Sequence, residues 1–203
     1  MSAVWEMETA EGMTFQGEDA TGRRLQGGRY IGCLFTGCQF DDTALCRCTF
    51  EKCRFVSCSF AGADWEGCAV LNATFRFCRL FNARFSRCKM TGTSLSESDC
   101  PCLNIDGGDW SYADLHGLDL SKMDLREVCF RGADLTGCSL KKSRLIDCCL
   151  EDARIANADF AEADVRGTGL AGADVLGANW KKAKIDLAQA VLLAEALGAA
   201  YTP

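Results

Sequence analysis

The sequence predicts an all-β solenoid, a parallel β-helix followed by a short C-terminal α-helix. Two observations predict the solenoid. From Phe15 to Ile185 every residue whose number is a multiple of five is apolar, and a series of small residues lies two positions before it. A helix repeats every 3.6 residues or so and a strand about every 2, so neither produces a period of five. An unbroken register over 35 pentads therefore indicates one continuous repeat architecture.

The residue types at each repeat position predict a four-sided coil. Ten of the fifteen cysteines lie two residues before the regularly apolar position, termed the centre, and Asp or Asn is common directly before the centre. We interpret each pentad as one side of the coil, with the centre and the small residue pointing inward and the other three positions facing water. Coils of about 20 residues stacked about 4.8 Å apart give roughly nine coils and a rod on the order of 40 Å long.

The pattern divides the chain into four parts: an N-terminal capping segment (1–12), the β-helix (13–185), a C-terminal helix (186–198) and a tail (199–203). Between Cys100 and Val128 the repeat departs from its usual residue types. Pro101 follows a centre, and Met123 replaces a small inward residue. Because proline fixes φ and removes a donor from the ladder, we expect a kink or a change of turn type there.

The helix at residues 186–198 has recognisable ends. Asp186 and Gln189 form a start resembling a capping box, and Gly198 is a natural stop. A helix this short is marginal by itself, and this one is apolar nearly all round, so it must bury one side against the β-helix and another against a partner. We predict a homodimer through this helix, with a simple end cap as the alternative. The predicted dimerisation residues are Leu187, Val191, Leu192, Leu193 and Leu197.

The sequence offers little for catalysis. His116 is the only histidine, and its place directly after a centre predicts a solvated side chain. The cysteines contain no spaced CxxC pair and most are expected inside the coil, so we predict no enzyme activity, no catalytic residue, no cofactor and no metal site. Four cysteines are expected to face outward, the last two as a pair on adjacent coils open to oxidation: Cys46, Cys102, Cys129 and Cys149.

The sequence also predicts a cytoplasmic protein without membrane association. No stretch approaches the roughly 20 apolar residues of a membrane helix. The N-terminus lacks a cationic start followed by an apolar run, and the odd number of cysteines argues against a secreted disulfide scaffold.

The charge favours a basic macromolecular partner. The chain has 28 acidic and 22 basic residues, whereas direct binding of nucleic acid needs a basic patch, so we predict no such binding. In the C-terminal half, the coil sides centred on Trp110, Leu115 and Leu125 each carry −2, and the side centred on Leu120 carries +2. The candidate partner-binding residues are Asp109, Asp124, Glu127, Asp147, Glu151 and Asp152.

The unbroken register, with triplets such as Ala163-Asp164-Val165, strongly resembles the pentapeptide-repeat family over about 85% of the chain. The resemblance implies a right-handed quadrilateral parallel β-helix. The run Gln189-Ala190-Val191-Leu192-Leu193, with Leu197-Gly198, looks like the C-terminal dimer helix of one subgroup, the proteins that protect DNA gyrase and topoisomerase IV.

This second resemblance implies a function. It suggests a DNA-mimicking homodimer that binds DNA gyrase, and possibly topoisomerase IV, and protects it from quinolones or toxins that act on the cleaved complex. Two arms of about 40 Å match roughly 25 base pairs, and a dimer joined at the C-terminal helices would place its acidic sides at the middle. The alternative is a generic pentapeptide-repeat scaffold with an unknown partner.

Overall fold

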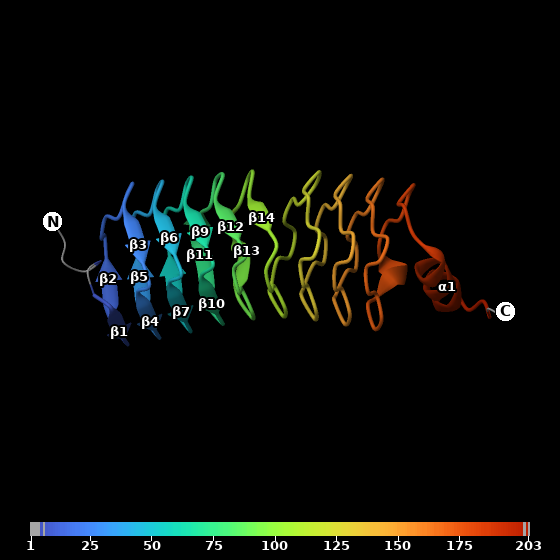
Figure 1. The fold of residues 1–203 in the computed structure, drawn as a ribbon, viewed down its shortest axis with the longest axis horizontal. Coiled ribbons are helices and arrows are strands. Elements are labelled where there is room, and N and C mark those ends of the chain that lie inside the picture. The colour runs from blue at the N-terminus through green and yellow to red at the C-terminus, as the bar shows by residue number, and fades with distance from the viewer. Residues whose placement is uncertain (1–4, 6, 201, 203) are drawn as a thin grey trace. The chain divides into compact units, whose positions relative to one another are not determined.

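The chain folds into two compact units, Met1–Asp109 and Trp110–Pro203, and each winds as a coil of the five-residue repeat (Figure 1). The structure is a computed structural model that describes residues 5, 7–200 and 202. The predicted parallel β-solenoid with one short C-terminal helix is confirmed.

The first unit holds the β-strands, which form three parallel sheets with the orders β1-β4-β7-β10, β13-β11-β8-β5-β2 and β14-β12-β9-β6-β3. Strand partners lie 20 residues apart, as in Phe35 and Phe55. A fourth side is joined by single bridges such as Gln39 with Ser59. The strands are β1 (Thr9–Glu11), β2 (Thr14–Gln16), β3 (Arg24–Gln26), β4 (Arg29–Ile31), β5 (Leu34–Thr36), β6 (Ala44–Cys46), β7 (Thr49–Glu51), β8 (Arg54–Val56), β9 (Asp64–Glu66), β10 (Ala69–Leu71), β11 (Thr74–Arg79), β12 (Arg84–Ser86), β13 (Ser94–Asp99) and β14 (Asn104–Asp106).

The centre residues build the core of this unit. Phe35 stacks on Phe55 with ring centroids 4.8 Å apart, and Phe55 stacks on Phe75 at 4.6 Å. Rings from neighbouring sides meet edge to face, as Phe55 does with Phe60. These rings are almost completely buried, as the register predicts. Each contributes about 1.5–3 kcal/mol by burial, so the column of aromatic rings accounts for much of the stability of the unit.

Trp5 covers the N-terminal end of this core. Its ring lies 6.1 Å from Phe15 and 4.9 Å from Phe40, and its indole N–H donates to the carbonyl of Asp19. The strand β1 also lies within the segment expected as a cap, with Ala10 buried as a further centre. Residues 1–4 and 6 of that segment lie outside the described residues.

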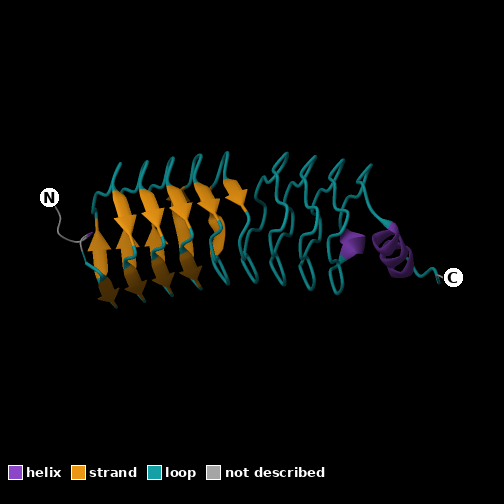
Figure 2. Cartoon of the chain, viewed as in Figure 1, coloured by secondary structure: helices purple, strands orange, loops and turns teal. Residues whose placement is uncertain are grey.

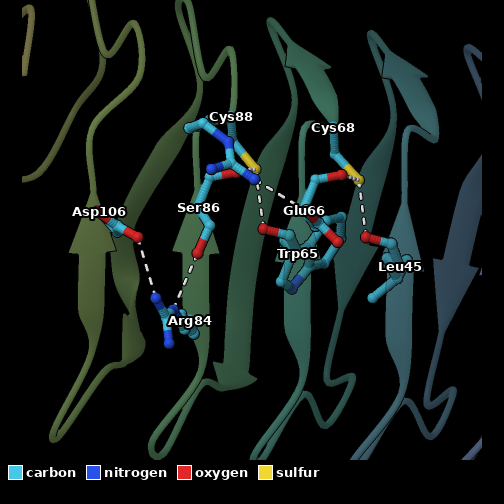
Figure 3. Close-up of polar contacts among 9 residues, drawn as sticks. Leu45, Trp65, Glu66, Cys68, Arg84, Ser86, Cys88 and Asp106 are labelled. Atoms are coloured by element: carbon cyan, nitrogen blue, oxygen red, sulfur yellow. Dashed lines mark hydrogen bonds and ion pairs between the residues drawn. The ribbon is translucent and has the colours of Figure 1, made fainter.

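The inward cysteines each donate a hydrogen bond to a main-chain carbonyl. The thiol of Cys68 donates to the carbonyl of Leu45, and that of Cys88 donates to the carbonyl of Trp65, both at 3.2 Å (Figure 3). In each case the acceptor lies 23 residues earlier, which is the centre of the preceding coil. Thr43 makes the same bond with Ala20. The position therefore selects small side chains, and a thiol or hydroxyl there satisfies a buried carbonyl that would otherwise cost free energy.

One of the four cysteines predicted to face outward is buried instead. Cys102 is exposed, and Cys129 and Cys149 are half-buried. Cys46 was predicted to face water, but only 7% of its surface is exposed. That prediction is wrong because Cys46 pairs in register with Gln26 and Glu66, so long side chains flank the small thiol on both sides.

The second unit has the same register with a different backbone. Its coils are joined by single-residue bridges, such as Asp114 with Asp134, and by two-residue turns. Figure 2 shows the orange strands confined to the first unit and the second unit drawn as teal coils with two helical segments, η2 (Val175–Gly177) and α1 (Leu187–Ala196). The predicted change of turn type is therefore observed, and in the described residues no strand follows β14.

The helix α1 begins at the predicted capping box. The Asp186 side chain accepts from the main-chain N–H of Gln189, and the Gln189 side chain accepts from that of Asp186, both at 3.0 Å. Gln189 is buried, and its amide donates to the carbonyls of Val165 and, at 3.0 Å, Thr168. Beyond the helix, Gly198 has a φ of +87°. Gln189 thus caps the N-terminus of α1 and also bonds the helix to the last coil.

Replacing Gln189 with leucine should lower the free energy of unfolding by about 1–3 kcal/mol, because the carbonyls of Val165 and Thr168 lose their donor while staying buried. Urea unfolding followed by circular dichroism measures the change. The exposed Ala188 is the matched control, because Ala188→Leu should change stability by less than about 0.5 kcal/mol. Equal stability of Q189L and the natural protein would show that these bonds contribute nothing.

Candidate interaction surface

The described residues contain no group of three or more His, Cys, Asp or Glu side chains arranged as a metal site. His116 is exposed, as predicted. Within the same residues, no helix has the length and apolar character needed to cross a bilayer. The candidate site is therefore an outer surface of the coil.

The corners of the coil present acidic residues to solvent. The residue two positions after a centre has a positive φ, which is 62° for Glu127, 58° for Asp147 and 60° for Asp152. All three side chains are exposed, and none has an ion-pair partner among the residues that the structure describes. Glu127 and Asp147 share one corner on adjacent coils, and Asp152 lies at the next corner.

The corner of Glu127 and Asp147 leads to the start of α1. The carboxylate of Asp147 leans over Gly167, where an added Cβ would lie 2.2 Å from it. The main-chain N–H of Gly167 donates to Asp186 at 2.7 Å. This bond and that from Gln189 hold the pKa of Asp186 below its usual value. Glu127, Asp147 and Asp186, termed the acidic corner, thus form a row of carboxylates that ends at the helix.

The other three predicted partner-binding residues have local partners. Asp124 pairs with Arg126 at 2.7 Å and with Arg144 at 3.5 Å, and the hydrogen bond from Arg126 lowers its pKa. Their opposite charges reduce what Asp124 offers to a partner protein.

Glu151 and Asp109 are engaged as well. Glu151 pairs with Arg131 at 3.2 Å and accepts from the thiol of Cys149, which lowers its pKa. Burial and this bond raise the pKa of Cys149 to about 12. Asp109 belongs to the first unit, where it accepts from the hydroxyl of Thr91 at 3.2 Å.

The side centred on Leu120 is basic. Lys141 pairs with Asp159 at 2.9 Å and Lys142 pairs with Glu162 at 3.8 Å. With Lys181 and Lys182 they line a shallow groove of about 410 Å³. The positive sign predicted for this side is therefore concentrated in one groove.

The helix α1 leaves an apolar face uncovered. Leu187 and Leu197 are 72% and 78% exposed. The groove on this face has a volume of about 260 Å³ and is lined by Leu187, Ala190, Val191, Ala194, Ala199 and Ala200. Of the predicted dimerisation residues, Leu187 and Val191 line the groove, whereas Leu192 and Leu193 are half-buried.

Sequence reasoning missed several exposed apolar side chains, of which three are large aliphatic or phenylalanine residues at outward repeat positions. Leu176 is 57% exposed in η2, the segment against which α1 packs. Phe77 and Phe81 are exposed in the first unit, with the Arg76 guanidinium 5.6 Å from the ring of Phe77. Each of the three occupies an outward repeat position, so a large apolar residue outside the inward series is the signal that could have found them.

The fold and these surfaces define a β-solenoid that displays charged and apolar faces. Eight repeats match the model of the Pentapeptide repeats family at residues 53–96, 111–141 and 148–184, which is more than half of the chain. The chain therefore belongs to the pentapeptide-repeat family, whose members are typically non-enzymatic scaffold proteins.

Two solved structures are similar to this chain, and the first of them, with the higher TM-score, shows the same fold. HetL, a pentapeptide-repeat protein involved in heterocyst differentiation regulation in the cyanobacterium Nostoc, is 19% identical with a TM-score of 0.70, over 88% of this chain and 89% of its own. QnrB1, a plasmid-mediated fluoroquinolone resistance protein, is 23% identical with a TM-score of 0.48, over 96% of this chain and 100% of its own. The search of curated proteins finds no match.

Proposed function

We propose that this chain is a DNA-mimicking homodimer that binds DNA gyrase, and possibly topoisomerase IV, through the carboxylates at the corners of its second unit. The proposal takes the partner from the likeness of the C-terminal helix to that of the gyrase-protecting subgroup. One observation supports the proposed arrangement. The acidic corner ends at α1, the helix whose apolar face is uncovered.

The acidic corner has the properties of an electrostatic contact. Its Glu127 and Asp147 carboxylates are exposed and lie on adjacent coils at about the 4.8 Å ladder spacing, so they present neighbouring negative charges as a phosphate backbone does. A basic DNA-binding saddle would meet such a row with favourable long-range attraction. In the dimer, two such rows would flank the joined helices, and binding would protect the enzyme from quinolones or toxins.

The second candidate function is a general pentapeptide-repeat scaffold with another partner. The ion pairs of Asp124 and Glu151 favour it, because they neutralise two of the carboxylates that a DNA mimic would use. The two candidates differ in their response to purified gyrase, which only the first must bind.

Neutralising the three exposed carboxylates that have no ion-pair partner among the described residues, as Glu127→Gln, Asp147→Asn and Asp152→Asn together, should weaken binding to gyrase about tenfold. Each exposed charge pair contributes about 0.2–1 kcal/mol, and about 1.4 kcal/mol corresponds to tenfold. Surface plasmon resonance at two salt concentrations measures the affinity, which added salt should also weaken.

The matched control reverses charge on the basic side. Lys141→Glu with Lys142→Glu changes more charge than the triple variant but lies on the face of the wrong sign for a DNA mimic, so it should affect binding less. Supercoiling by gyrase with and without a quinolone shows the consequence for the enzyme. Affinity that responds neither to the triple variant nor to salt would exclude mimicry, and absence of binding would favour the general scaffold.

A further inference from the structure

Two cysteines of the second unit lie one above the other on the outside of adjacent coils. Cys129 and Cys149 form a parallel bridge, and each directly precedes a centre, so both side chains leave the same side of the coil. Both are half-buried free thiols. Their position differs from that of the inward cysteines, which are fully covered and bonded to carbonyls of the core.

Oxygen atoms lie at both ends of this thiol pair. The hydroxyl of Ser111 is 3.3 Å from the sulfur of Cys129. At the other end the thiol of Cys149 donates to Glu151. The next residue in the ladder is Gly169, where an added Cβ would lie 2.5 Å from the Glu151 carboxylate. The carboxylate therefore fills the place of the missing side chain and completes a row of oxygen, sulfur, sulfur and oxygen.

The spacing of the pair suits a bridging cation. Adjacent strands lie about 4.8 Å apart. Disulfides have Cα separations of about 4.4–6.8 Å, so this spacing also admits a disulfide, and the experiment below distinguishes the two. Two metal–thiolate bonds of about 2.3 Å in a line span about 4.6 Å, which is close to the ladder spacing.

The ligand types select the cation. Thiolates prefer soft metal ions such as Cu(I). In the described part of the chain, no group of three or more His, Cys, Asp or Glu side chains is arranged to hold a metal ion, so the pair and the adjacent Glu151 do not form the tetrahedral site that zinc requires. A two-coordinate ion needs no third ligand.

We propose that Cys129 and Cys149 form a two-sulfur site for a soft monovalent cation such as Cu(I). One cation replaces two thiol protons, which pass to solvent, and the two new metal–sulfur bonds leave a complex of charge −1. No electron is transferred. Arg131, which pairs with Glu151 at 3.2 Å, supplies positive charge beside this anion. The site does not depend on the partner proposed for the acidic corner.

Anaerobic titration of the reduced full-length protein with Cu(I), against a coloured Cu(I) chelator, tests the site. The natural protein should hold one equivalent more than the double variant Cys129→Ser with Cys149→Ser, and either single variant should lower the affinity at least tenfold. Cys102→Ser, which removes an exposed cysteine outside the pair, should bind as the natural protein does. Ag(I), which does not change oxidation state under these conditions, should give the same order of affinities among these proteins.

The melting temperature gives a second readout, which does not depend on measuring how much metal the protein binds. One equivalent of Ag(I) should raise the melting temperature of the natural protein and of C102S but not that of the double variant, because ligands stabilise the state that binds them. Equal Cu(I) uptake by the natural protein and the double variant would overturn the proposal. So would a reduced protein that refuses Cu(I) yet forms a disulfide between residues 129 and 149 in oxidised glutathione.

Discussion

Replacing Phe75 with aspartate should abolish the folding of the first unit. The ring is 1% exposed, stacks on Phe55 at 4.6 Å and meets Phe60 at 5.5 Å. Removing a buried phenylalanine costs about 3–5 kcal/mol, and an unpaired carboxylate in its place adds a desolvation cost of several more. The sum is comparable with the whole stability of a typical domain, about 5–15 kcal/mol.

Phe77 provides the matched control for this substitution. It lies two residues further along β11 and is 65% exposed, so Phe77→Asp introduces the same charge without burying it. Circular dichroism and urea unfolding should show an unfolded or aggregated F75D and an F77D close to the natural protein. A soluble, thermostable F75D with an unchanged spectrum would refute the inward register on which the fold assignment depends.

The fold was predictable because one rule applies to every coil. A residue such as Phe55 must be inward wherever the coil stacks, so periodicity alone identifies the core. The capping box of Asp186 and Gln189 was equally readable, because its two hydrogen bonds depend on residues three apart. The strands end at β14, within the segment where Pro101 and larger inward side chains depart from the usual residue types, so local composition marked the change.

The surface was less predictable because it depends on neighbours 20 residues away whose side chains are long and flexible. Cys46 occupies an outward position, but Gln26 and Glu66 flank it in the ladder. Asp124 and Glu127 lie three residues apart on one side of the coil. Asp124 forms ion pairs with Arg126 and Arg144, whereas Glu127 forms none among the described residues. A sum of charges over a side of the coil cannot separate the two cases.

Replacing Leu187 with glutamate should convert a dimer into monomers. Leu187 is 72% exposed and lines the apolar groove of α1 with Val191, so a second copy of the helix would bury it. A glutamate there would lie in an apolar interface without a partner charge, which should weaken dimerisation at least about 100-fold, or about 2.7 kcal/mol. Removing residues 186–203 should have the same effect.

Light scattering coupled to gel filtration at micromolar concentration measures the mass. Ala188→Glu is the matched control. Ala188 is exposed and does not line the groove, and the substitution adds the same charge to the same turn of α1. A natural protein that is monomeric under these conditions would exclude the dimer, and a dimer that survives L187E and the truncation would place the interface elsewhere. The apolar face is continuous with the acidic corner through Asp186, so loss of the dimer with an unchanged fold should also weaken any binding that needs two rows of carboxylates at once.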